Sequence, residues 1–82
     1  MNNSLYNEFA AHFAASTLTS LVESFNSQVG NRGFTSARAA HNKALIDEFV
    51  RRGIDVSAVY DGTATSYAHH VELDNNRLVI RK

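Results

Sequence analysis

The first third of the chain carries apolar residues at helical spacing in two stretches whose faces do not coincide. In each stretch an apolar residue returns every three or four positions, as on one face of an α-helix. The second stripe lies about a third of a turn around from the first, so one straight helix cannot bury both. The phase changes at Ser16 and Thr17, whose hydroxyls compete for backbone hydrogen bonds. We therefore predict two helices, over residues 4–15 and 18–29, with a single helix over 4–29 as the alternative.

A third amphipathic segment follows the break at Gly30. The spacing of its apolar residues predicts a helix over 35–52, with Thr35 or Ser36 as the N-cap. Gly53 comes directly after this pattern, where a glycine readily adopts the left-handed conformation that ends many helices. The third helix is therefore expected to stop there.

Beyond the third helix the period of the apolar residues falls to two, which is typical of β-strands. The turn dipeptides Asp61-Gly62 and Asn75-Asn76 divide this region into strands predicted over 54–60, 63–73 and 77–81. Pairing across two-residue turns at both places puts six apolar side chains on one face. They are Val56, Tyr67, Val71, Leu73, Leu78 and Ile80.

The first of these strands has a competing interpretation. Asp55 is a good capping residue, and it could start a short helical turn that runs through Tyr60. Residues 54–60 are therefore either a strand or a helical turn. The meander becomes a hairpin in the second case.

These elements predict an α+β fold, with two or three N-terminal helices packed on a C-terminal antiparallel β-meander or hairpin. The chain has 82 residues, which allows a single domain over 1–82 with one core. It contains no cysteine, so no disulfide is available and apolar packing has to supply the stability.

The chain shows no sign of a membrane segment or of a signal peptide. No apolar run approaches the roughly 20 residues that a membrane-spanning helix needs. Near the N-terminus Asn7, Glu8 and His12 interrupt the apolar residues that a signal peptide would require. We therefore expect a cytoplasmic protein with no membrane partner.

The sequence shows no arrangement of catalytic or metal-binding residues. It lacks the Gly-x-Ser-x-Gly motif of serine hydrolases. His69 and His70 are adjacent on a predicted strand and so point to opposite faces, which prevents joint binding of one metal ion. We interpret His69 as a packed core residue. The chain is thus expected to be no enzyme and to use neither a cofactor nor a metal.

One segment resembles a nucleic-acid-binding loop. Gly30, Asn31, Arg32 and Gly33 are similar to the Gly-x-x-Gly loop of KH domains. That resemblance implies that the loop's backbone and its basic residue hold a single-stranded nucleic acid. A glycine-bounded turn between two helices accounts for the same four residues.

The order of the elements also resembles a winged helix, with three helices followed by a hairpin. In this interpretation Thr35, Ser36, Arg38 and Asn42 lie near the start of a recognition helix and contact nucleic acid. The formal net charge of zero supplies no general attraction to phosphates. Nucleic-acid binding is therefore the alternative hypothesis.

The leading hypothesis is a non-enzymatic protein-interaction module that binds a second copy of itself or another protein. It rests on a small core and on two candidate contact surfaces. One is the aromatic face of the first helix, and the other is a strip of small residues that permits close approach of another helix. Their residues are Tyr6, Phe9 and Phe13, and Ala37, Ala40 and Ala44. The competing interpretation is that these surfaces pack on each other within one chain.

Overall fold

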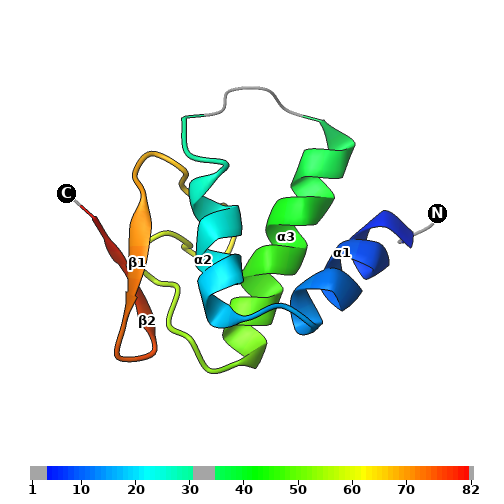
Figure 1. Ribbon diagram of the computed structural model, residues 1–82. Helices are drawn as coiled ribbons and strands as arrows, with labels where there is room; N and C mark the ends of the chain where they lie inside the picture. The colour runs from blue at the N-terminus through cyan, green and yellow to red at the C-terminus, as the bar shows by residue number, and fades with distance from the viewer. Residues whose placement is uncertain (1–3, 31–34, 82) are drawn as a thin grey trace.

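The computed structural model describes residues 4–30 and 35–81. Three helices precede a two-stranded antiparallel hairpin, which confirms the predicted α+β class. The helices are α1 (Ser4–Ala14), α2 (Leu18–Asn26) and α3 (Ser36–Arg51), and the strands are β1 (Val71–Asp74) and β2 (Arg77–Ile80). In Figure 1 α3 occupies the centre, with α1 on one side and with α2 and the hairpin on the other.

The break between the first two helices lies where the phase of the apolar residues predicts it. The Thr17 hydroxyl accepts a hydrogen bond from the Ser20 amide at 3.1 Å and caps α2. Leu21 and Phe25 then reach the core on one face of α2 and are fully buried. The single-helix alternative for 4–29 is therefore wrong.

Both predicted ends of α3 are confirmed. The Thr35 hydroxyl accepts from the Arg38 amide at 3.0 Å at the N-terminus. At the C-terminus Gly53 has φ +79°, and the amide of Ile54 donates to the Phe49 carbonyl at 2.9 Å. This is a Schellman arrangement, in which the buried side chains of Ile54 and Phe49 supply the accompanying apolar contact.

A cluster of charged and polar groups joins the end of α1 to α3. The Arg52 guanidinium donates to the carbonyls of Phe13 at 2.9 Å, Ala14 at 3.3 Å and Ser16 at 2.7 Å. Arg52 Nε also donates to the Glu48 carboxylate at 2.6 Å. Glu48 is only 5% exposed. Arg52, the C-cap residue of α3, therefore donates to carbonyls at and just beyond the α1 C-terminus and also pairs with a buried carboxylate.

The hairpin confirms the predicted register at its turn. Asn75 and Asn76 both have positive φ, and Leu73 faces Leu78 across the two strands. Val71 and Leu78 are buried, whereas Leu73 and Ile80 are 37% and 36% exposed. Figure 1 shows α2 beside the hairpin. In each of these two cross-strand apolar pairs, Val71 with Ile80 and Leu78 with Leu73, one side chain is therefore buried and the other is partly exposed.

The Asn26 side chain holds the hairpin to the end of α2. Its amide nitrogen donates to the Val71 carbonyl at 3.0 Å, and its oxygen accepts from the Val71 amide at 2.8 Å. The side chain thus pairs with the outer edge of β1 as a neighbouring strand would. Position 71 is fixed against the helical layer.

The predicted strand over 54–60 is wrong, and the alternative turn is correct. The Asp55 carboxylate accepts from the Ser57 amide at 2.8 Å, and the amides of Val59 and Tyr60 donate to the Val56 carbonyl at 3.0 and 2.9 Å. Only isolated bridges form near the two ends of this segment, from Asp55 to Arg77 of β2 and from Tyr60 to Thr65. The capping carboxylate and the burial of Val59 favour a helical turn over an extended strand.

The predicted strand over 63–73 begins too early, because β1 comprises only Val71–Asp74. The Asp61 carboxylate accepts hydrogen bonds from the amides of Thr63 and Ala64, at 2.8 and 2.9 Å. These local bonds occupy backbone amides that would be free to pair with a neighbouring strand if the turn had only two residues. Instead of a paired strand, the segment forms one isolated β-bridge, between Tyr60 and Thr65.

None of the helices in residues 4–30 and 35–81 combines the length with the apolar character that crossing a membrane requires.

Replacing Arg52 with alanine is expected to lower the free energy of unfolding by about 2–4 kcal/mol, because three carbonyls and a buried carboxylate lose a charged donor. Urea denaturation measures this change. Arg51→Ala is the matched control, since Arg51 also pairs with Glu48 but its side chain is 63% exposed. Equal losses in the two variants would contradict the role assigned to Arg52.

The stability of the fold is also expected to depend on the charge of Glu48. Hydrogen bonds from Arg51 outweigh the opposing effect of burial and, with Arg52, hold the pKa of Glu48 below its ordinary value of 4.5. Ionised Glu48 therefore stabilises the folded chain at neutral pH, and this contribution is lost as the pH falls from 4.5 through the folded-state pKa.

Melting temperatures between pH 3 and pH 7 test this dependence on wild type and on Glu48→Gln. Asp55 and Asp61 also have lowered pKa values, through bonds from backbone amides, and they are unchanged in both proteins. The stability difference between the two proteins should shrink toward low pH. Parallel curves would show that Glu48 contributes nothing to the acid dependence.

Candidate functional site

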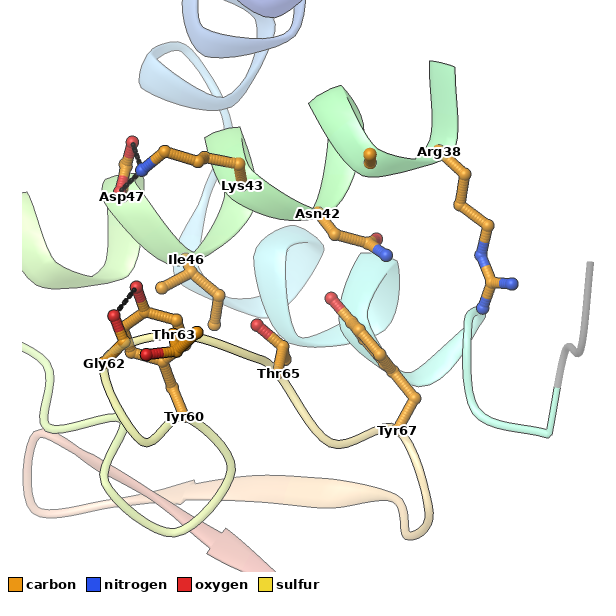
Figure 2. Close-up of a pocket in the computed structure, with 11 residues that line it drawn as sticks. Arg38, Asn42, Lys43, Ile46, Asp47, Tyr60, Gly62, Thr63, Thr65 and Tyr67 are labelled. Atoms are coloured by element: carbon orange, nitrogen blue, oxygen red, sulfur yellow. Dashed lines mark hydrogen bonds and ion pairs between the residues drawn. The ribbon is translucent and has the colours of Figure 1, made fainter. Parts of the chain in front are cut away.

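A cleft of about 790 Å³ separates residues 38–47 of α3 from the irregular segment 60–67. Figure 2 shows α3 along one wall and this segment along the other. The described residues that line it are Arg38, Ala39, Asn42, Lys43, Ile46, Asp47, Tyr60, Gly62, Thr63, Thr65 and Tyr67. The cleft thus combines charged, hydroxyl and amide groups with apolar surface.

The charged groups of the cleft all come from α3. Arg38 Nε donates to the Gln28 side-chain oxygen at 2.7 Å, and its terminal nitrogen donates to the Gln28 carbonyl at 3.2 Å. Lys43 lies one turn before Asp47, and the two form an ion pair at 3.3 Å. Two cations and one carboxylate therefore leave this wall with one net positive charge.

Asp47 is already engaged by two partners. Besides Lys43, the Tyr6 hydroxyl of α1 donates to its carboxylate at 2.5 Å. That hydrogen bond, followed by burial and by the carboxylate charge, raises the pKa of Tyr6. Asp47 is thus a paired structural carboxylate at the boundary between the cleft and α1.

Tyr67 is held from two directions on the opposite wall. Its ring packs on Phe25 of α2, with the ring centroids 4.5 Å apart. Its carbonyl accepts from the Gly30 amide at 3.4 Å. Figure 2 shows the side chain rising toward α3, with its hydroxyl between Asn42 and Thr65.

The hydroxyl of Tyr67 is a buried polar group without a hydrogen-bond partner among the described residues. Burial raises the pKa of Tyr67 to about 12, although the charge of Arg38 acts in the opposite direction. The group is therefore a protonated donor at neutral pH. An unpaired buried hydroxyl is uncommon in folded proteins and calls for an explanation.

Two residues of the predicted nucleic-acid surface lie in the cleft, namely Arg38 and Asn42. Asn42, half-buried, has its side-chain oxygen 3.2 Å from Nδ1 of His41. Thr35 and Ser36 are exposed at the start of α3, and Gly30 is exposed after α2. Asn31, Arg32 and Gly33 lie outside the described residues.

The predicted protein-contact surface is mostly used within the chain. Phe13 and Ala44 are each only 1% exposed, so no partner can reach them. Tyr6, Phe9 and Ala40 are half-buried, and Ala37 alone of the six is exposed.

Aromatic contacts show what covers these residues. The rings of Phe9 and Phe13 lie 5.1 and 5.2 Å from the ring of His41 on α3. Helical geometry places Ala40 and Ala44 between His41 and Asp47 around α3, and both of the latter contact α1. The helix that approaches the alanine strip is therefore α1 of the same chain.

Sequence reasoning missed the whole wall formed by residues 60–67. The alternating pattern places Tyr67 on the predicted apolar face, where a tyrosine hydroxyl would be buried and would need a partner, and this is the one available signal. His69 is exposed, contrary to its interpretation as a core residue, because β1 begins only at Val71. In the part of the chain that is described, no three His, Cys, Asp or Glu side chains are grouped to hold a metal ion.

Comparison of the chain with models of protein families, with curated proteins and with solved structures finds no match to any of them.

The alkaline stability of the fold should report the environment of Tyr67. Because the pKa of Tyr67 is about 12 in the folded chain and 10.0 ordinarily, ionisation favours unfolding as the pH rises from 10 to 12. Melting temperatures over this range should fall more steeply for wild type than for Tyr67→Phe. Identical slopes would show that the Tyr67 hydroxyl is not shielded from water.

Proposed function

We propose that this chain is a non-enzymatic binding module, and that the cleft between α3 and segment 60–67 binds a short segment of another protein. The observation that carries the proposal is the cleft itself, with its volume of about 790 Å³ and an unpaired buried hydroxyl at its wall. Clefts of this size with a few convergent polar groups are the usual places where proteins bind ligands.

The chemistry of the lining favours binding over catalysis. The described lining residues include neither histidine nor cysteine, and their one carboxylate, Asp47, is paired with Tyr6 and Lys43. No nucleophile with an adjacent base is present among these side chains. The available groups are suited to hydrogen bonding and apolar contact.

The dimensions and charge of the cleft favour a peptide over a nucleic acid. From Arg38 to Asp47 the wall runs roughly 13 Å along α3, which matches about four residues of extended peptide. Nucleic acids require several cations to neutralise neighbouring phosphates. The cleft carries one net positive charge, and the exposed Ala39 supplies apolar surface that a peptide side chain can cover.

Blocking the cleft tests the proposal. Heptapeptides selected from a random library on the wild-type protein should perturb the amide resonances of the cleft in NMR titrations. Ala39→Trp fills the cleft from an exposed position and should weaken their binding by about tenfold or more, without lowering the melting temperature.

Ala37→Trp is the matched control, because Ala37 is exposed on the same helix and does not line the cleft. It should leave peptide binding unchanged. Loss of binding with Ala37→Trp but not with Ala39→Trp would move the contact surface to the α1 side and overturn the proposal.

Two further outcomes would also overturn it. Random single- or double-stranded oligonucleotides that bind at low salt and lose affinity with Arg38→Ala would establish the nucleic-acid alternative. A molecular mass that rises with concentration in light scattering, and is reduced by Ala39→Trp, would make a second copy of the chain the occupant of the cleft.

A further inference from the structure

The unpaired hydroxyl of Tyr67 occupies a position from which it cannot easily find a partner within the chain. The ring is packed on Phe25, and the Tyr67 carbonyl accepts a hydrogen bond from Gly30, so neither ring nor backbone is free to shift. A phenylalanine would make the same ring contacts without burying a polar atom. The hydroxyl therefore carries a cost that the folded chain does not repay.

Several of the groups that line the cleft are hydrogen-bond donors. Arg38, Asn42 and Lys43 follow one another along the α3 wall, and Thr65 adds a hydroxyl from the other wall. The Asn42 side-chain oxygen lies against His41, which leaves its amide nitrogen as the group available to a ligand. A surface rich in donors is complementary to a ligand that presents acceptor oxygens.

The charge balance selects among acceptor groups. Arg38 and Lys43 with Asp47 sum to one positive charge, which matches a carboxylate better than a doubly charged phosphate. The hydroxyl stays protonated at neutral pH, since the pKa of Tyr67 is about 12, so it can donate to an anion. Hydrogen bonds between such donors and a carboxylate are among the stronger ones in proteins.

We propose that the space between Asn42 and Tyr67 receives a carboxylate group of the bound peptide, and that the Tyr67 hydroxyl donates a hydrogen bond to it. This inference rests on the proposed function. The hydroxyl is covered in the unbound protein, so the carboxylate enters when the side chain of Asn42 or Thr65 rotates aside. Rotations of this kind are common when binding surfaces are occupied.

A double-mutant cycle tests the inference. The probes are a selected heptapeptide that contains glutamate, the same peptide with glutamine in its place, and both peptides with an amidated C-terminus. On the wild-type protein, removal of the interacting carboxylate should weaken binding about tenfold. The glutamine and amide forms together identify whether that carboxylate belongs to a side chain or to the peptide C-terminus.

Tyr67→Phe should weaken binding of the carboxylate peptide about tenfold and leave binding of the carboxylate-free peptide unchanged. Its melting temperature at neutral pH should equal or exceed that of wild type, because no hydrogen bond within the chain is lost. Tyr60→Phe is the matched control, since the Tyr60 hydroxyl lines the same cleft but donates to the Gly62 carbonyl at 3.0 Å. It should preserve the ratio between the two peptides.

An unchanged ratio in Tyr67→Phe would overturn the inference, and so would a melting temperature several degrees below wild type, which would reveal a partner within the fold. Displacement of the carboxylate peptide by an equal concentration of inorganic phosphate would overturn the choice of carboxylate. Each of these results leaves the proposed function standing if Ala39→Trp still weakens peptide binding. Insensitivity to Ala39→Trp would remove the proposed function itself.

Discussion

The arrangement of the helices depends on the guanidinium of Arg52, which joins three parts of the chain at one point. It donates to the carbonyls of Phe13 and Ala14 at the end of α1 and to the carbonyl of Ser16 in the following connection. A helix C-terminus has unpaired carbonyls and a partial negative charge, so a cation there satisfies both. Glu48 completes the arrangement, because its buried carboxylate needs a cation and orients this one.

This constraint extends to the candidate site through two packed elements. Fixing the carbonyl of Ser16 sets the place where Thr17 begins α2, and α2 carries Phe25 to the ring of Tyr67. The same α3 that is followed directly by Arg52 supplies one wall of the cleft from residues 38–47. The site therefore lies on the side of α3 that α1 does not cover. The position of α1 is fixed at the C-terminal end of α3, by Arg52.

The sequence predicted the parts of the fold whose local chemistry and apolar pattern agree. The hairpin register is correct because alternation and the Asn75-Asn76 turn lead to the same pairing. The ends of α3 are correct because Thr35 and Gly53 each carry a specific capping function. These features depend on neighbours within a few residues, which a single sequence displays directly.

The strand over 54–60 was mispredicted because two local signals compete there. Alternation favours an extended strand, whereas Asp55 favours a capped turn that buries Val59 against the core. Because residues 54–60 form no strand, the segment after Asp61 has no neighbouring strand to pair with and forms only one isolated bridge, between Thr65 and Tyr60. The cleft wall is made of this irregular segment, and its position opposite α3 depends on tertiary packing that no periodicity records. Arg38 and Asn42 are therefore the only residues of the cleft that the sequence predicted as site residues.

The identity of residue 67 shows how a cost in stability can carry information about function. Its ring is needed, because it covers Phe25 and closes the core beside α2. Its hydroxyl is not needed for that packing, and burial without a partner makes it unfavourable. Phenylalanine would satisfy every contact seen in the folded chain at lower cost. A tyrosine at this position is explained if a ligand supplies the missing hydrogen-bond partner. The hydroxyl donor is then already oriented and shielded from water before the ligand binds.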